Sequence, residues 1–457
     1  MVLRMNPRPD PTPASRPQAE PHAGDHSGFG RPILIIFLLG CALHLWLLSR
    51  SWVDLDQLYL LELGQEFVRT GTLAPMAKVM SGGGMIPGSL LQLLSGLPLM
   101  LWQDYRAPLV PIAILNLLPA PILLATLRGR VRGEVLLALF AFYWLSPWRL
   151  IFAAILWEPA YIFALAAAHL WACTRLSEAR RGWPSFVLGA LLVWAPQIHG
   201  SFLFLWALTA LLLVRRRISP HGPALAFGAT VGGLTLVPLL LAAIAGTLPS
   251  SLPRDGFIGR GLVYVLPMLK VVPYWLRLPT LDIGTPLRQV IYLHADDGAA
   301  TVIARATQIL STLTILLPAA TYWSYFRRWR AGTAPAGRYS WFERYAGYSL
   351  VALALAAALS PVTLQGWHVT IALLPASIPP ACWIGERMAG RAHRGAMIGY
   401  LLLGVVVVIV IGLGKPAFRK ETLPSELGRF PAVAPLLPSN LPVERVPRDP
   451  SSSPPSR

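Results

Sequence analysis

The chain has 457 residues, of which 54% are apolar and only 13% are charged, about half the charged share of an ordinary soluble domain. Its apolar residues gather in blocks of roughly 18 or more, the length that crosses a bilayer as a helix. The net charge is +18, and the arginines form short clusters between these blocks, as in cytoplasmic loops rather than nucleic-acid surfaces. These properties exclude a soluble enzyme, a disordered scaffold and a secreted disulfide module. They predict an all-α polytopic membrane protein that binds no nucleic acid.

The two ends of the chain differ from the apolar middle. Residues 1–31 are polar and rich in Pro, Gly and His, which predicts a disordered cytoplasmic tail. The apolar block from Pro32 to Leu48 has no small-residue cleavage pattern after it, so it predicts an uncleaved anchor rather than a signal peptide. Residues 415–457 are rich in Pro and Ser and predict a second disordered tail.

The basic clusters set the expected topology. The first span runs from inside to outside, so residues 51–106 form a long first outer loop. The apolar block 86–103 would place the basic turn RGRVRG outside if it crossed, so we expect an outer interfacial helix there. About eleven transmembrane helices result, at about 32–50, 107–127, 134–147, 158–175, 185–197, 201–214, 223–246, 301–325, 345–361, 368–386 and 395–414.

A second outer segment follows these first spans. Residues 247–300 are semi-apolar and contain scattered Pro, Tyr, Trp, Arg and Asp, which predicts an extracytoplasmic loop with interfacial helices. Residues 301–414 form the C-terminal transmembrane helices. The count leaves the final tail outside, but the basic residues from Lys415 to Lys420 favour the inside, so the orientation of the last helix stays open.

Acidic residues are scarce, and three of them fall at the expected outer mouth. Asp54 and Asp56 follow the first span and begin an amphipathic helix that includes Tyr59. Asp54 fits an N-cap, whereas Asp56 favours a functional role. Glu158 opens a helix after the sequence SPW, where compensation of the helix dipole and a functional role are equally well supported.

Several polar residues near the outer face are candidates for binding a phosphate. Gln197 and His199 lie between two short apolar runs, and a neutral histidine there would donate to a phosphate or serve as an interfacial residue. His368 lies at another outer turn, beside Trp367, a residue type that commonly anchors the interface. The loop 247–300 adds cations for a phosphate clamp: Arg254, Arg260, Lys270, Arg277 and Arg288.

The order of these elements resembles the glycosyltransferase C superfamily, specifically bacterial enzymes of the aminoarabinose transferase and protein O-mannosyltransferase (family 39-like) type. The resemblance covers about residues 32–246, from the first outer acid through SGGGMIPGSLLQLLSGLPL and LRGRVRGE to SPW, Glu158 and QIH. The chain departs from the family pattern in three places. Gln57 follows Asp56 where a Glu is common, Glu158 replaces a more usual Asp, and many relatives have a Lys at the Gln197–His199 element. These departures leave the donor sugar and the base open.

The resemblance implies an inverting transfer of a sugar from a polyprenyl-phosphate donor to a glycan, lipid or protein acceptor, outside the bacterial cytoplasmic membrane. Asp56 is then the expected general base, and Glu158 would orient the acceptor or hold a divalent cation, the one cofactor that the sequence leaves open. His199 and the cations of residues 254–288 would meet the leaving phosphate. Two alternatives remain: a glycan polymerase or ligase that uses lipid pyrophosphates, and a lipid-sugar flippase or transporter.

Overall fold

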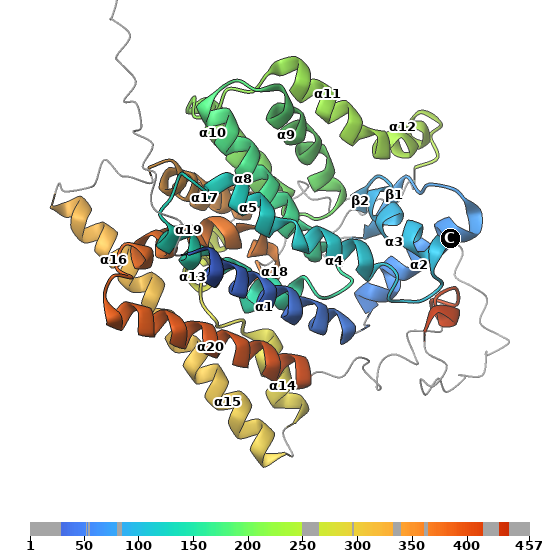
Figure 1. Cartoon of the computed structure of the whole chain (residues 1–457). Coiled ribbons are helices and arrows are strands. Elements are labelled where there is room, and N and C mark those ends of the chain that lie inside the picture. The colour runs from blue at the N-terminus through green and yellow to red at the C-terminus, as the bar shows by residue number, and fades with distance from the viewer. Residues whose placement is uncertain are drawn as a thin grey trace, which may run out of the picture.

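The computed structural model describes residues 29–51, 53, 55–79, 85–248, 265–294, 297–331, 340–360, 364–414 and 429–437. This part of the chain is almost entirely helical, which confirms the predicted all-α polytopic membrane protein (Figure 1). One small addition was not predicted. Strands β1 (Met76–Val79) and β2 (Met85–Pro87) form an antiparallel pair inside the first outer loop.

The helices of the first half form the main bundle. In chain order they are α1 (Gly30–Ser49), α2 (Leu55–Thr70), α3 (Leu90–Leu101), α4 (Leu109–Leu117), α5 (Pro119–Leu127), α6 (Gly133–Leu139), the π-helix η1 (Phe140–Trp144), α7 (Pro147–Phe152), η2 (Glu158–Ala160), α8 (Ile162–Glu178), α9 (Gly182–Trp194), η3 (Ala195–Gln197), α10 (Phe202–Val214), α11 (Gly222–Gly233), η4 (Leu234–Leu236) and α12 (Val237–Ile244).

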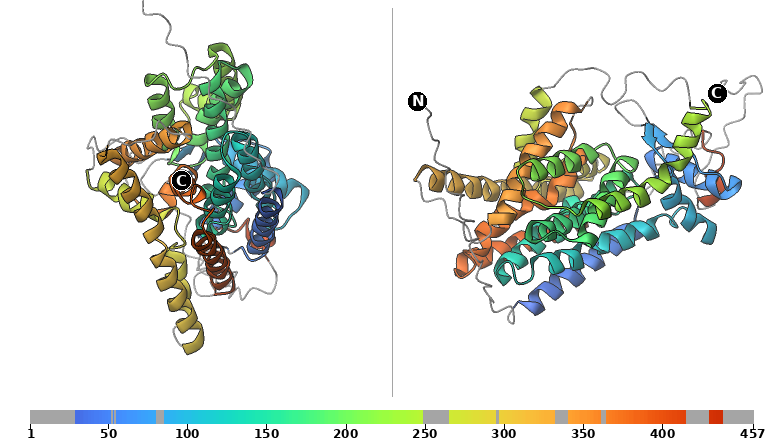
Figure 2. Two further views of the ribbon diagram at one scale, coloured as in Figure 1. Left: turned by 60° about the vertical axis from the view of Figure 1, so that its left-hand side comes forward. Right: turned by 90° about the horizontal axis from the view of Figure 1, so that it is seen from above.

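The second half completes the bundle and adds peripheral helices (Figure 2). Its elements are α13 (Val265–Arg277), α14 (Thr285–Leu293), α15 (Gly298–Leu313), α16 (Leu316–Arg330), α17 (Ser340–Leu359), α18 (Gly366–Val369), η5 (Thr370–Ala372), α19 (Leu373–Gly385), α20 (Arg391–Gly414) and η6 (Ala434–Leu436).

Six helical stretches of the described chain are long and apolar enough to cross a membrane: Gly30–Ser49, Leu109–Leu127, Gly222–Ile244, Gly298–Arg330, Gly366–Gly385 and Arg391–Gly414. Other predicted spans coincide with shorter helices, so the number of crossings remains a prediction. The block expected to lie at the interface forms α3, which has 12 residues and is about 18 Å long, too short for a bilayer core of about 30 Å.

The first and last long helices finish side by side. The Arg50 Nε atom, just after α1, donates a hydrogen bond of 2.8 Å to the carbonyl of Gly412 in α20. Helices α2 and α3 and the β1–β2 pair gather at this same end of the bundle (Figure 1). The structure therefore concentrates the first outer loop at one end of the membrane domain.

A short C-terminal segment, residues 429–437, also packs at this end. The ring of Phe430 meets the ring of Tyr59 edge-on, with centroids 4.8 Å apart, and Val433 is fully buried. The amide of Tyr105 donates to the carbonyl of Leu436. These residues lie in the region predicted as a disordered tail. The structure differs there because the apolar side chains of the segment find partners on the first outer loop.

Helices α9 and α11 approach each other so closely that a glycine is required at their contact. A Cβ atom at Gly228 would overlap the carbonyl group of Phe186, whereas Gly233, on the same helix, faces open space. We expect Gly228→Ala to destabilise the protein by about 1–3 kcal/mol, the usual cost of overpacking, and Gly233→Ala to be neutral. Thermal unfolding in detergent checks this. Equal melting temperatures for the two variants would contradict it.

Candidate active site

The centre of the site is an ammonium group held between two carboxylates. The Lys78 Nζ atom lies 2.5 Å from Asp56 Oδ1 and 2.8 Å from Glu158 Oε1. The Lys78 side chain is 12% exposed and that of Glu158 is 5% exposed, whereas that of Asp56 is 47% exposed. Two acids from distant parts of the chain therefore share one cation, and only Asp56 keeps substantial access to solvent or ligand.

Three separate elements bring these groups together. Asp56 lies in the first turn of α2, where the helix dipole favours a negative charge. Lys78 lies on β1, and Glu158 begins η2 between α7 and α8. The approach to β1 is fixed because Ser89 Oγ donates to the carbonyl of Ala74 over 2.6 Å. The lysine is thus held by the hairpin rather than by a flexible loop.

The charges of the three groups support one another. Burial lowers the pKa of Lys78, but the carboxylates of Glu158 and Asp56 outweigh it, so the net pKa is raised and the ammonium stays protonated at neutral pH. Burial raises the pKa of Glu158, and the ammonium of Lys78 opposes that shift. Lys78 is therefore a fixed positive charge, and Glu158 is its buried partner.

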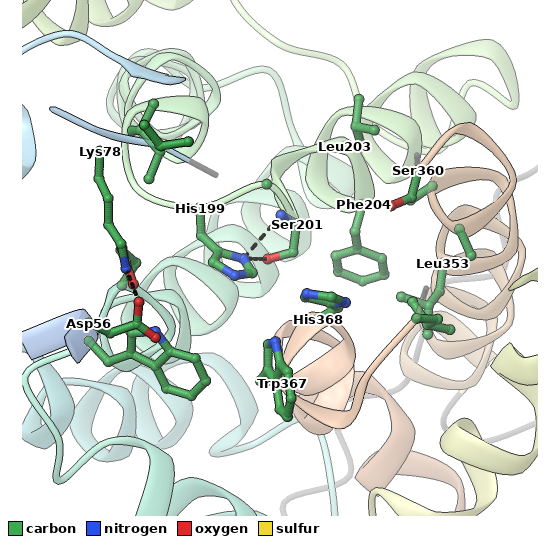
Figure 3. Close-up of a pocket in the computed structure, with 18 residues that line it drawn as sticks. Asp56, Lys78, His199, Ser201, Leu203, Phe204, Leu353, Ser360, Trp367 and His368 are labelled. Carbon is green, nitrogen blue, oxygen red and sulfur yellow. Dashed lines mark hydrogen bonds and ion pairs between the residues drawn. The ribbon is translucent and has the colours of Figure 1, made fainter. Parts of the chain in front are cut away.

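Two cavities meet at this group. The first, the lysine cavity, has a volume of about 120 Å³. Figure 3 shows its labelled lining residues: Asp56, Lys78, His199, Ser201, Leu203, Phe204, Leu353, Ser360, Trp367 and His368. The second, the arginine cavity, has a volume of about 500 Å³ and is lined by residues that include Asp56, Trp148, Tyr274, Arg277, Arg288 and Gln365. Asp56, Trp157 and Trp367 line both cavities, so the exposed carboxylate stands at their junction.

Two histidines face each other across the lysine cavity, with ring centroids 6.2 Å apart (Figure 3). The backbone amide of Ser201 donates to His199 Nδ1 over 3.1 Å. The amide of Gln365 likewise donates to His368 Nδ1. Because Nδ1 is the acceptor in both neutral rings, Nε2 carries the proton in each. The cavity therefore has two neutral N–H donors near the Lys78 cation.

His199 should make the protein less stable in mild acid. Burial, assisted by the neighbouring His368 and Lys78, lowers its pKa from 6.5 to about 3. Below about pH 6.5 the His199 side chain therefore binds a proton in the unfolded chain but stays neutral in the folded chain. As a result, the free energy of unfolding falls as the pH drops. We expect His199→Gln to reduce by a few degrees the fall in melting temperature between pH 7 and pH 5. An unchanged fall in the variant would contradict this assignment.

No protein-family model matches the chain, and no curated protein matches it in sequence. Among solved structures, the chain is similar to the crystal structure of ArnT from Cupriavidus metallidurans bound to undecaprenyl phosphate, with a TM-score of 0.51 and 14% sequence identity. The match covers 85% of this chain and 76% of that chain. The two chains therefore share a fold. This confirms the resemblance predicted from the order of the sequence elements.

Within this fold, some of the predicted binding residues lie away from both cavities. The Gln197 amide is buried and fully used, since it donates to the carbonyls of Val193 and Gly232 and accepts from the hydroxyl of Thr235. It ties the α9–α10 connection to α11 and η4. Tyr59 packs against the C-terminal segment, and neither it nor Gln197 lines either cavity.

The cations predicted to clamp a phosphate are dispersed. Arg277 lines the arginine cavity and pairs with Asp282 over 2.9 Å. Arg288 lines the same cavity, whereas Lys270 is exposed and lines neither cavity. Three further candidates, Asp54, Arg254 and Arg260, lie outside the described residues. His368 and His199 are the predicted phosphate-binding residues that line the lysine cavity together with Asp56 and Glu158.

Sequence reasoning missed Lys78, although one signal was present. The chain has four lysines against 35 arginines, so a lysine inside the first outer loop is unusual for this composition. Nothing in the spacing of Asp56, Lys78 and Glu158 indicates that they meet. The aromatic junction of Trp157 and Trp367, whose ring centroids are 5.8 Å apart, was also missed because tryptophan near an interface normally indicates an anchor.

The described residues contain no group of three or more His, Cys, Asp or Glu side chains that could hold a metal ion. In addition, Lys78 occupies the position between Asp56 and Glu158 that a bridging divalent cation would take. The two acids in this arrangement therefore do not fit a metal site, because the ammonium already balances their charge.

Proposed function

We propose that the protein is an inverting membrane glycosyltransferase that moves a sugar from a polyprenyl-phosphate donor to a hydroxyl group of an acceptor. The observation that carries the proposal is the Lys78 ammonium bridging Asp56 and Glu158 where two cavities meet. The similarity in fold to ArnT, which was crystallised bound to undecaprenyl phosphate, supports a polyprenyl-phosphate substrate.

Asp56 is the proposed general base because it is the accessible acid of the three-residue group and borders both cavities. Its carboxylate accepts the proton of the acceptor hydroxyl while the hydroxyl oxygen attacks the anomeric carbon of the donor sugar. The bond between that carbon and the phosphate oxygen breaks on the opposite face, so the configuration inverts. Polyprenyl phosphate leaves with the bonding electrons.

The lysine cavity suits the donor. Its walls include Leu203 and Phe204 from α10 and Leu353 from α17, which provide an apolar surface for the first isoprene units. The Nε2–H group of His199 and the Lys78 ammonium supply donors and positive charge for the phosphate, whose negative charge grows as the sugar leaves. Glu158 holds the Lys78 ammonium in place. Asp56, the second carboxylate that pairs with Lys78, remains at the junction of the two cavities.

The proposed membrane is the bacterial cytoplasmic membrane, with the site on its extracytoplasmic face. This orientation is supported by the arginine clusters at the opposite ends of the helices, such as Arg128, Arg130 and Arg132 between α5 and α6. A donor carried on a polyprenyl lipid is available at that surface, which agrees with a site at the end of the bundle rather than at its middle.

The decisive experiment incubates the purified protein in nanodiscs with a panel of polyprenyl-phosphate sugars and a crude cell-envelope extract as acceptor. The readout is free polyprenyl phosphate, compared with the Asp56→Asn variant. We expect release from at least one donor that depends on Asp56. Release only from lipid-pyrophosphate sugars would favour a polymerase or ligase. Movement of intact lipid-linked sugar across the membrane without cleavage would favour a flippase.

A further inference from the structure

We infer that the acceptor is a saccharide carrying a negative charge, bound in the arginine cavity with Arg288 as its anion-binding residue. The inference rests on the proposed function, since the bound saccharide must present a hydroxyl group to Asp56.

The walls of the arginine cavity have the composition of a sugar-binding site. Its aromatic members are Trp148, Phe152, Trp157, Tyr274 and Trp367, and polar side chains such as Gln289 also line it. Flat aromatic faces pack against the apolar faces of a sugar ring, while amides and hydroxyls bond its hydroxyl groups. The cavity has about four times the volume of the lysine cavity, about 500 Å³ against about 120 Å³. It therefore has room for more than one sugar ring.

The two arginines of the cavity differ in their partners. Arg277 is already engaged: it bonds the Asp282 carboxylate and carbonyl over 2.9 Å each and lies 5.6 Å from the Trp148 ring. Arg288, on α14, is exposed and forms no ion pair with any described residue. Among the described residues that line the cavity, the one acid is Asp56, and it is paired with Lys78. The cavity thus offers one uncompensated guanidinium, a group suited to carboxylate or phosphate.

Trp148 contributes a fixed aromatic ring to the same wall. Its Nε1 atom is buried and has no hydrogen-bond partner among the described residues. The ring is held in place because Gly366 lets α18 approach it, since a Cβ atom there would lie 3.0 Å from the ring. Because this atom is not accessible from the cavity, Trp148 contributes the packing surface of its ring rather than a hydrogen-bond donor.

The test measures binding of defined saccharides to the full chain in nanodiscs by calorimetry, without any donor. The probes are maltotriose, maltotriose ending in glucuronate, and phosphorylated maltotriose. We expect at least one acidic probe to bind about tenfold or more tightly than maltotriose, the scale of a charge-assisted hydrogen bond. Arg288→Gln should remove that preference. Arg69→Gln, which removes an exposed charge on α2 outside both cavities, should retain it.

Each outcome supports or overturns the inference. The acidic probe that binds with the higher affinity shows whether the cavity selects a carboxylate or a phosphate. Equal binding of all three probes, no binding of any, or an acidic preference that survives Arg288→Gln would overturn it. Competition of undecaprenyl phosphate with the acidic probe would also overturn it, because the cavity would then hold the donor. A different result would contradict the proposed function: acidic saccharides bind in this test, but no polyprenyl-phosphate sugar is cleaved in the transfer assay.

Discussion

Asp56→Asn should reduce the rate of sugar transfer by about a hundredfold or more, the scale for removing a general base. Asparagine has nearly the same size as aspartate but cannot take a proton from the acceptor hydroxyl. The fold should survive because Lys78 keeps its 2.8 Å ion pair with Glu158, its more buried partner. The measurement is the rate of polyprenyl phosphate release at saturating donor and acceptor, together with the melting temperature of the variant.

Glu66→Gln is the matched control for this substitution. Glu66 is another acid of α2, is exposed, and lines neither cavity, so its removal should leave transfer unchanged. Near wild-type turnover in Asp56→Asn would contradict the assignment of Asp56 as the general base. Equal losses in the two variants would mean that the charge of α2, rather than one carboxylate, is what transfer requires.

Lys78→Met should abolish transfer and also destabilise the protein. It removes the cation expected at the leaving phosphate, where single donors contribute about 100- to 1,000-fold. It also leaves the Glu158 carboxylate, 5% exposed, without its countercharge. Breaking a buried ion pair in this way typically costs about 3–5 kcal/mol. We expect both a lower unfolding midpoint and transfer below detection.

A second substitution separates the two effects. In Lys78→Met/Glu158→Gln the buried charge is gone, so much of the lost stability should return. Transfer should not return, because the phosphate still lacks its cation. Recovery of transfer in the double variant would show that Lys78 acts only through the stability of the fold.

The amino-acid sequence predicts the helical architecture well because bilayer thickness and the positive-inside rule constrain it. The position of the basic turn RGRVRG, rather than the length of the apolar block, separates the expected interfacial helix α3 from α20, which is long enough to cross. The scarcity of acids likewise draws attention to Asp56 and Glu158, since a carboxylate near a bilayer is costly. Their meeting in one site agrees with the order of elements that suggested a glycosyltransferase C-like fold.

The sequence does not show which distant residues pair with one another. Lys78 meets its two acids only because the β1–β2 hairpin lies against the end of the bundle, and hydropathy carries no information on that placement. Gln197 has the chemistry of a phosphate ligand, yet its amide is used to join helices. Phe430 lies among Pro and Ser that predict disorder, but its ring has a partner on α2.

The contact between Arg50 and Gly412 also bears on whether the chain crosses the membrane an odd or an even number of times. Helices α1 and α20 both finish at the end of the bundle where this hydrogen bond forms, so they point the same way through the bilayer. A chain whose first and last crossings are parallel must cross an odd number of times. We therefore expect the polypeptide to enter α1 in one compartment and to leave α20 in the other, despite the basic residues that follow Gly414. A reporter fused before α1 and one fused after α20 should respond to opposite sides of the membrane.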